Sequence, residues 1–230
     1  NISYLFGNLT NANTVIPVDG SSGIFETDLK VRDFHLSFGA QYAIEWGKKH
    51  MLTIGAVYSP GKALLGKAYT STYDVGSSTV IDADTLNMKS HYSLASTYGG
   101  GISYNYDKRL TVAADVTYQN WADAKFTNLN AGQLQTSTGQ FNNRLKVALG
   151  AEFRPKSMGG NYLQRINYRA GLFYNRSYLK INGNDLNEIG ATCGFGFPLA
   201  TDKSVVNVAF EYINRQCSPQ KLITEDHFRI

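Results

Sequence analysis

The chain has 230 residues, of which 43% are hydrophobic, 13% aromatic and 17% charged, and its net charge is +4. Charged residues are scarce against the roughly 25% of ordinary soluble domains, whereas tyrosine (15) and glycine (22) are abundant. No apolar run approaches the roughly 18 residues of a membrane helix, and no basic block of the kind that follows nucleic acid occurs. Composition therefore excludes a helical membrane protein and indicates no nucleic-acid partner.

A strict alternation of apolar and polar residues runs through most of the chain. Residues 33–46 read DFHLSFGAQYAIEW, in which every second residue is apolar. Alternation with a period of two predicts β-strands. In chain order the predicted strands are 2–9, 33–46, 52–58, 98–106, 110–118, 145–153, 166–174, 189–197, 206–212 and 223–230, ten in all. The first and last are partial, so we expect one β-barrel domain over residues 1–230, truncated at both ends.

The predicted connections differ in length between the two ends of the strands. The short ones are 47–49, 107–108, 198–203 and, longest of this set, 155–164. The long polar ones are 10–27, 60–90 and 122–141, with shorter counterparts at 179–187 and 216–222. Short turns at one end and long loops at the other are typical of an outer-membrane barrel, with periplasmic turns and surface loops.

A soluble sandwich or a lipocalin-like barrel, with its apolar face turned inward, is the alternative. Strands of soluble proteins most often have about 5 or 6 residues, and several strands here are longer. Strand length and loop asymmetry favour an antiparallel transmembrane β-barrel of the bacterial outer membrane. Because every backbone N–H and C=O must be paired in lipid, such a sheet has to close.

Aromatic residues mark the predicted ends of the strands. Trp46 and Tyr106 lie next to short turns, and Tyr58, Tyr118 and Tyr174 lie near long loops. Those are the two heights at which aromatic girdles form in membrane barrels. The alternative is that each is an ordinary strand-favouring aromatic residue.

Three segments resemble a known family. They are GGGISYNYDKRLTVAADVTYQNWADAKF (99–126), LKVALGAEFRP (145–155) with INYRAGLFYNRSYL (166–179), and IGATCGFGFPLATDKSVVNVAFEYINR (189–215). They are similar to the strands of the FadL/TodX outer membrane transporters of long-chain fatty acids and hydrocarbons. The resemblance implies a fourteen-stranded barrel with an N-terminal hatch, of which this chain holds the last ten strands. The hatch and the early strands, which carry the family's gate and lateral opening, would then lie outside it.

Charged residues on the polar parity of the strands are the first candidate site. Asp115, Glu152, Arg169 and Glu211 share this parity, with Arg154 in the same polar network. A symmetric turn over residues 155–164 would bring Arg169 near Glu152, where its guanidinium could bind the carboxylate of a ligand. The alternative is a salt-bridged network that only fills the barrel interior.

The long connection over residues 60–90 is the second candidate site. Its candidate ligand-binding residues are Lys62, Leu64, Leu65 and Lys67. Apolar residues between lysines suit an amphipathic acid, whose tail would contact the leucines and whose head would contact a lysine. The family resemblance implies an initial ligand groove between residues 10–27 and 60–90. The alternative is that residues 63–73 extend a strand beyond the membrane.

No other chemistry is indicated. The four histidines are scattered without ligand spacing, so no metal site is expected. No nucleophile motif stands out, so we expect neither an enzyme nor a cofactor. Cys193 and Cys217 lie too far apart along the predicted hairpin for a disulfide, which predicts two free thiols.

The sequence predicts a channel for passive uptake of hydrophobic small molecules such as long-chain fatty acids, with membrane lipid around it. One alternative is a non-transporting barrel that scaffolds a surface or secretion assembly, with an assembly partner. The other is a non-specific porin. An apolar lumen would favour hydrophobic uptake, large loops without such a lining would favour the scaffold, and an open charged lumen would favour the porin.

Overall fold

The computed structural model describes residues 1–15, 23–74, 76–77, 79–130, 133–155, 161–199 and 204–230. Antiparallel strands dominate these residues, beside one short α-helix, α1 (Met88–His91), and one 3-10 turn, η1 (Tyr162–Gln164). None of the helices in these ranges is long and apolar enough to cross a membrane. The chain forms two compact units. Unit 1 comprises Asn1–Ser37, Ser59–Ser96 and Asp123–Gly139, and unit 2 comprises Phe38–Tyr58, Thr97–Ala122 and Gln140–Ile230.

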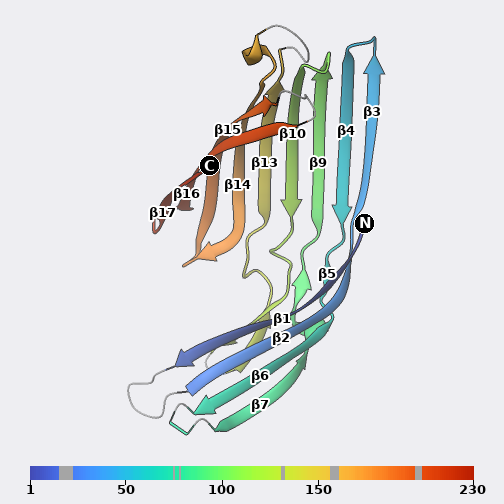
Figure 1. Cartoon of the computed structure of the whole chain (residues 1–230). Coiled ribbons are helices and arrows are strands. Elements are labelled where there is room, and N and C mark those ends of the chain that lie inside the picture. Colours follow the sequence, from blue (N-terminus) through green and yellow to red (C-terminus); the bar gives the residue numbers. More distant parts are fainter. Residues whose placement is uncertain (16–22, 75, 78, 131–132, 156–160, 200–203) are drawn as a thin grey trace. The chain divides into compact units, whose positions relative to one another are not determined.

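Unit 2 is a single nine-stranded sheet. Its strands, in spatial order, are β3 (Phe38–Trp46), β4 (His50–Ser59), β9 (Thr97–Tyr106), β10 (Leu110–Gln119), β13 (Arg144–Phe153), β14 (Asn167–Ile181), β15 (Asn184–Pro198), β16 (Val205–Ser218) and β17 (Thr224–Arg229). Spatial order follows chain order, so the sheet is an up-and-down meander (Figure 1). It matches the last nine predicted strands. Among the described strands the sheet stays open, with β3 and β17 at its edges, and does not show the expected closure.

The tight turns of unit 2 lie where the sequence predicts them. Gly47, between β3 and β4, has a φ of 64°, and Asp107 and Lys108, between β9 and β10, have φ values of 53° and 56°. Left-handed residues in a short hairpin turn match the right-handed twist of the strands they join. The predicted turns at 47–49 and 107–108 are therefore confirmed.

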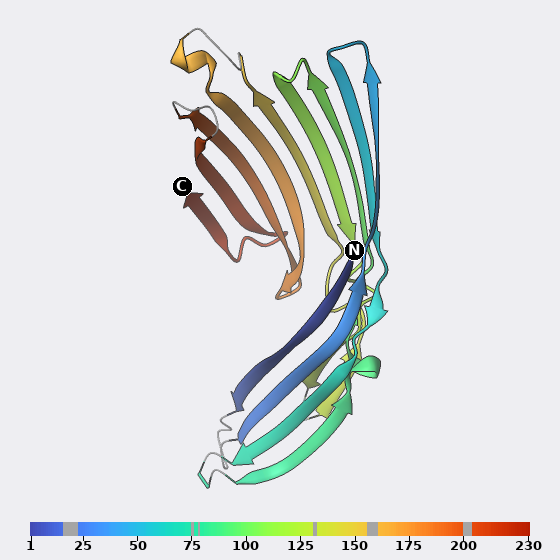
Figure 2. The same cartoon turned by 45° about the vertical axis from the view of Figure 1, so that its right-hand side comes forward.

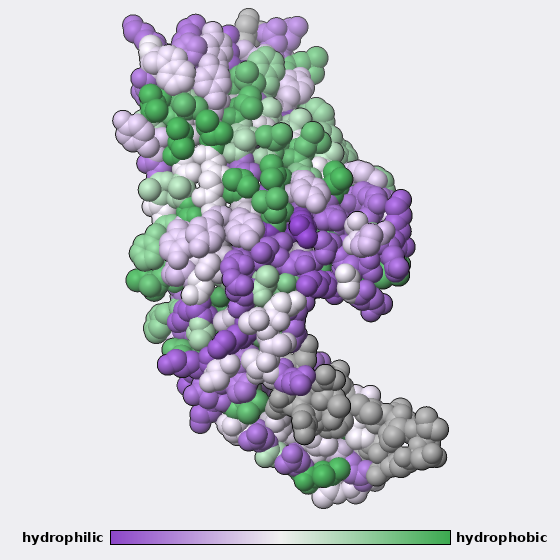
Figure 3. All heavy atoms as spheres, turned by 180° about the vertical axis from the view of Figure 1, so that it is seen from behind, coloured by the Kyte–Doolittle hydropathy of each residue, from purple (hydrophilic) through white to green (hydrophobic). Residues whose placement is uncertain are grey.

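Alternation gives the sheet of unit 2 an apolar face. Neighbouring strands bring apolar residues of the same parity together, as in the pairs Phe38–Tyr58, Tyr42–Ile54, Val116–Val147 and Leu149–Leu172. No second layer of described residues covers them: Leu172 and Ile189 are each 61% exposed. Figure 3 shows the apolar face of unit 2 as a band of hydrophobic residues bordered by aromatic and hydrophilic ones. The large apolar side chains of this face thus point out of the protein.

Unit 1 has a small core of its own. Its main sheet has the order β1 (Ile2–Val15), β2 (Gly23–Leu36), β6 (Gly66–Asp74) and β7 (Val80–Asn87), with these strands adjacent in Figure 2. Two small hairpins accompany it: β5 (Lys62–Ala63) with β8 (Ser93–Leu94), and β11 (Phe126–Asn130) with β12 (Gln133–Ser137). Ala68, Met88 and Tyr92 are buried together, with Leu64 packed against them.

Three predicted loops contain regular strands instead. The connections 10–27 and 60–90 supply parts of β1, β2, β6 and β7, and 122–141 supplies β11 and β12. Residues 16–22, 75, 78 and 131–132 of these connections lie outside the described residues. The loop predictions are wrong because these strands are rich in Thr, Ser, Asn and Tyr. A sheet without one buried apolar face needs no alternation, so the usual signal is missing.

The long alternating stretch 33–46 is divided between the units. Its first residues complete β2, and β3 begins at Phe38. At the break, Ser37 accepts a hydrogen bond from the Asn1 amino group (2.8 Å) and donates its own N–H to the Asn1 carbonyl (2.9 Å). Its hydroxyl meets that of Ser59 at 2.7 Å. The prediction of one unbroken strand is therefore wrong, because hydrogen-bonding partners change at Ser37 while the side-chain parity continues.

Candidate functional site

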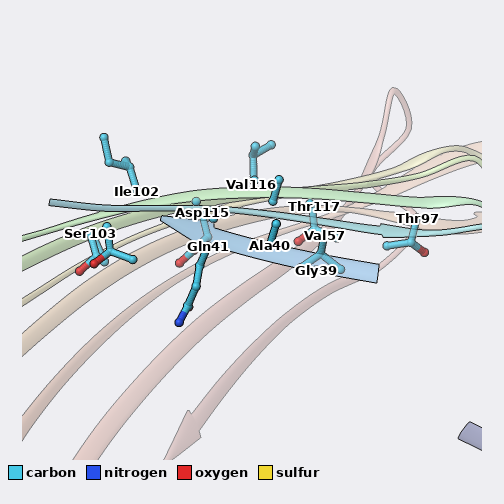
Figure 4. A pocket seen from close by; sticks show the side chains of 17 residues that line it. Gly39, Ala40, Gln41, Val57, Thr97, Ile102, Ser103, Asp115, Val116 and Thr117 are labelled. Atoms are coloured by element: carbon cyan, nitrogen blue, oxygen red, sulfur yellow. The ribbon is translucent and has the colours of Figure 1, made fainter. Parts of the chain in front are cut away.

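The polar face of the unit 2 sheet carries the candidate site. Along every strand its residues alternate with those of the apolar face. In Figure 4 Ile102 and Val116 point to one side of the strands, whereas Gln41, Ser103 and Asp115 point to the other. The polar face holds small and charged side chains and contains two adjacent hollows.

The first hollow is lined largely by glycine and small residues. It measures about 680 Å³ and lies over β3, β4, β9 and β10. Gly39, Gly55, Gly99 and Gly101 line it. At Gly101 a Cβ atom would lie 2.2 Å from an oxygen of Asp115, so a larger residue there would require that carboxylate to move. The result is a shallow surface with one exposed carboxylate.

The second hollow brings together the four inward charges named from the sequence. It measures about 510 Å³, and Asp115, Glu152, Arg169 and Glu211 all line it. Arg169 donates from Nε to Glu152 at 2.7 Å and from Nη1 to Asn207 at 2.8 Å. The expected proximity of Arg169 and Glu152 is therefore observed, and the pair is also a direct cross-strand neighbour.

The other members of the predicted polar network have separate partners. Arg229 donates to Glu211 across 3.4 Å, and Arg154 donates to the side chain of Asn167. Arg154 does not line either hollow. Glu152 and Glu211 thus each pair with an arginine of a neighbouring strand, which neutralises these two carboxylates locally.

A longer polar row on this face was not predicted as a unit. It comprises one residue on each of β10, β13, β14, β15 and β16 and two on β17: Gln119, Arg144, Asn175, Glu188, Arg215, and Glu225 with His227. Arg144 donates to Asn175 (3.0 Å), and Asn175 donates to Glu188 (2.8 Å). Arg215 bridges Glu188 (2.7 Å) and Glu225 (3.2 Å). Polar parity was readable from the sequence, but this row requires the register between strands, which only the fold supplies.

The predicted girdle residues gather in two rows on the apolar face. Near the short turns, Trp46 stacks on His50 with ring centroids 5.6 Å apart, and Tyr106 lies 5.1 Å from the same imidazole. Toward the other end of the strands, Tyr98 lies 5.1 Å from Tyr58 and 6.5 Å from Tyr118. Sequence reasoning did not include Tyr98 in a girdle, although its alternation placed it on the same face.

Tyr174 completes the second set of predicted girdle residues. It lies opposite Val147 and Ile189 on the apolar face, and its hydroxyl donates to Asn187 at 3.2 Å. An apolar ring with a hydrogen-bonded hydroxyl suits a boundary between hydrocarbon and water.

The loop lysine proposed as a headgroup contact already has a partner. In unit 1 Lys62 donates to Asp33 Oδ1 at 2.5 Å, and the Asp33 side chain is fully buried. The amides of Phe34 and Leu65 donate to the same carboxylate at 2.7 and 3.0 Å. Lys62 therefore joins two segments of unit 1 and is not free to receive a ligand carboxylate.

The other candidates of this segment do not converge with Lys62. Leu64 packs against the buried cluster of unit 1, whereas Leu65 is 45% exposed. Lys67 is exposed on β6, where it lies opposite Lys30 of β2. Residues 66–73 of this segment are a strand, β6, as the alternative expected, whereas its extension beyond the membrane stays a prediction.

The two cysteines and the possible metal ligands are separate features of the sequence. Cys193 lies opposite Phe210, Cys217 lies opposite Leu186, and both thiols are free. Within the described ranges no three His, Cys, Asp or Glu residues are grouped to hold a metal ion.

Comparison with known proteins supports the fold. A family model described as BamG matches residues 1–230. A FadL homologue from Pseudomonas aeruginosa is similar in structure, with a TM-score of 0.58 and 13% identity over 94% of this chain and 55% of that chain. CymD, a monoaromatic hydrocarbon channel, gives a TM-score of 0.43 and 14% identity over 94% and 72%. A search among curated proteins gave no match.

At 13% sequence identity, the similarity to the FadL homologue shows a shared fold and nothing further. The chain spans about half the length of that protein. The resemblance to FadL/TodX transporters is therefore supported for the fold, whereas the matching family carries the different name BamG.

Proposed function

Because the chain belongs to the BamG family and unit 2 is a single-layered sheet, we propose that it forms the wall of a β-barrel in the bacterial outer membrane. Side chains such as Leu149 (54% exposed) and Leu172 (61%) would lie against hydrocarbon. The antiparallel ladder satisfies the backbone groups between its strands, as lipid requires. The observation that carries the proposal is the exposed apolar face between two aromatic rows.

For the barrel's activity, we propose a scaffold in a membrane assembly that does not itself transport. A site for a hydrophobic ligand is lined mostly by apolar and aromatic side chains. The hollows of the polar face are instead lined mostly by glycine, alanine, small polar and charged residues, and Phe173 is the only aromatic side chain among the described residues that line them. Arg169, the proposed anchor, is engaged by Glu152 and Asn207, so a ligand carboxylate would compete with Glu152 for the guanidinium.

Passive uptake of hydrophobic small molecules such as long-chain fatty acids is the second candidate function. The observation in its favour is the shared fold with a FadL homologue. In this case the ligand would enter the second hollow, and Arg169 would bind its acid group. A non-specific porin would use the same charged face as the wall of a water-filled passage.

The membrane setting is tested with two arginine substitutions on adjacent residues of β13. Leu149→Arg places a charge on the apolar face, which should cost about 2–4 kcal/mol of folding free energy in a bilayer. Ala148→Arg, on the polar face, should cost much less. Folding into lipid vesicles, followed by urea unfolding, measures both. Equal costs, or a protein that stays monodisperse without surfactant, would overturn the proposal.

Scaffold and channel are separated with the native, full-length protein in vesicles. A scaffold should leave the permeability to a fluorescent fatty acid and to small sugars at the level of empty vesicles. Extraction from native membranes in mild detergent should then yield one defined complex larger than a single barrel. Fatty-acid entry that drops in Arg169→Ala would establish the second candidate instead, and sugar entry would establish the porin.

A further inference from the structure

Two neighbouring turns of unit 2 form a basic platform. The β3–β4 turn contributes Lys48 and Lys49, and the β9–β10 turn contributes Lys108 and Arg109. Because β4 and β9 are adjacent in the sheet, these turns lie side by side at one end of it. Asp107 is the only carboxylate within the two turns.

Direct bonds join the two turns. The Asp107 amide donates to the Lys49 carbonyl at 2.6 Å. The Asp107 carboxylate lies 3.7 Å from the Lys49 ammonium and 3.3 Å from the Arg109 guanidinium. One carboxylate thus holds one cation from each turn in place and leaves the platform with excess positive charge.

The cationic groups remain accessible to an external anion. The side chains of Lys49 and Arg109 are 57% and 55% exposed despite their contact with Asp107. Lys48 and Lys108 are also exposed, and neither makes a side-chain ion pair within the described residues. The left-handed φ of Lys108, with its amide bonded to Asn105, fixes this turn's backbone.

An aromatic cluster adjoins the platform on the apolar face. It consists of Trp46, His50, Tyr104 and Tyr106. The His50 Nδ1 atom lies 2.8 Å from the Tyr104 hydroxyl, which links β4 to β9 directly below the turns. Figure 3 shows the hydrophilic rim of unit 2 next to its apolar band. Amphipathic rings lie at the headgroup level of a bilayer, so the cations just beyond them reach the phosphates.

We propose that this platform binds the phosphate groups of anionic phospholipids in the leaflet that faces the short turns. The inference rests on the proposed membrane setting and adds the headgroup class and its binding residues. Lys48 and Lys108 contact phosphates directly, while Lys49 and Arg109 are positioned by Asp107. The aromatic cluster fixes the depth of the platform in the bilayer. Lipid phosphates therefore bind these cations in preference to water-exposed lysines elsewhere.

The test uses the full chain in nanodiscs that contain equal amounts of phosphatidylglycerol and phosphatidylethanolamine. After mild extraction, mass spectrometry counts the lipids of each class that remain bound. The wild-type protein should retain phosphatidylglycerol preferentially. Two double variants each remove one turn's cations: Lys48→Gln/Lys49→Gln and Lys108→Asn/Arg109→Gln. Each removes one lysine that has no ion pair, Lys48 or Lys108, and should lower the preference by roughly fivefold for that lysine. High salt should also lower the preference in the wild-type protein.

A matched control removes two exposed cations from unit 1, Lys89→Gln/Lys125→Gln, and should leave the preference unchanged. Equal loss in control and turn variants, or no preference in inserted wild-type protein, overturns the inference alone. Displacement of the bound lipid by free glycerol 3-phosphate would identify a soluble phosphate ligand and also overturn it. Wild-type protein that fails to enter nanodiscs contradicts the membrane setting itself.

Discussion

At the scale of single residues, Asp33 shows how a buried charge organises unit 1. Its carboxylate receives hydrogen bonds from Lys62, Phe34 and Leu65. Burial by itself raises its pKa, but these hydrogen bonds and the nearby ammonium outweigh burial, so the pKa of Asp33 lies below its ordinary value of 3.8. The sequence placed Asp33 on a polar strand face and Lys62 in a loop, and nothing in either pattern indicated that they meet.

Removing the charge of Asp33 should loosen the segment that begins with β5. We expect Asp33→Asn to reduce the free energy of local opening by about 2 kcal/mol, because hydrogen bonds to a charged group are lost. Hydrogen exchange at the Leu65 amide measures this energy. The matched control is Asp28→Asn, which removes a partly exposed carboxylate 3.8 Å from Lys30 and should change exchange at Leu65 little.

Acid should release the same contact. A carboxylate with a lowered pKa in the folded state stabilises the fold fully above its ordinary pKa, and this contribution is lost as the pH falls through the lowered value. Protection of the Leu65 amide, corrected for intrinsic exchange, should therefore hold down to about the ordinary value of 3.8 and fall below it. The step should be absent in Asp33→Asn. A step well above 3.8 in the wild-type protein would contradict the lowered pKa.

At the scale of elements, the β14–β15 hairpin shows what a loop prediction missed. Residues 179–187 were expected to be a surface connection, but β14 runs to Ile181 and β15 begins at Asn184. Asn182 and Gly183 make the turn, with φ values of 49° and 79°. An Asn-Gly pair is a strong hairpin signal. The residues on either side of this pair are polar, so the apolar alternation stops before the two strands end. The sequence pattern therefore did not predict this hairpin.

The left-handed turn predicts a ranking of substitutions at Gly183. Gly183→Val should destabilise unit 2 by about 1–2 kcal/mol, since a β-branched residue is strained at positive φ. Gly183→Asn should cost much less because asparagine tolerates this conformation. Nothing lies within 4 Å of a Cβ at this position, so crowding does not confuse the comparison. Unfolding of both variants in lipid vesicles gives the two energies, and equal costs would argue against the turn.

At the scale of the whole molecule, unit 2 is a single layer of sheet rather than two layers packed around a core. The large apolar side chains of one face are exposed, while charged side chains pair across the opposite face. A soluble sheet would reverse this arrangement by covering its apolar face. Solvent on one face and hydrocarbon on the other is the environment that satisfies both faces at once.

The two tryptophans report on this arrangement. Trp46 is 44% exposed on the apolar face, whereas Trp121 stacks on Tyr178 and donates to Gln119. In vesicles of brominated lipid we expect strong quenching of Trp46 fluorescence in Trp121→Phe. Quenching of Trp121 in Trp46→Phe should be weaker because its ring is covered by protein. Similar quenching of both rings would count against the assigned lipid-facing side.

The sequence by itself determined which residues share a face of each unit 2 strand, because side chains alternate whatever the neighbouring strand is. It therefore predicted the sheet, its tight turns and the parity of Arg169 and Glu152. Tertiary structure alone decided the division at Ser37, the strands of unit 1 other than the predicted first part of β1, and the row from Arg144 to Glu225. Those depend on hydrogen-bond register between distant segments, and register is set by how strands pair rather than by the pattern within any one of them.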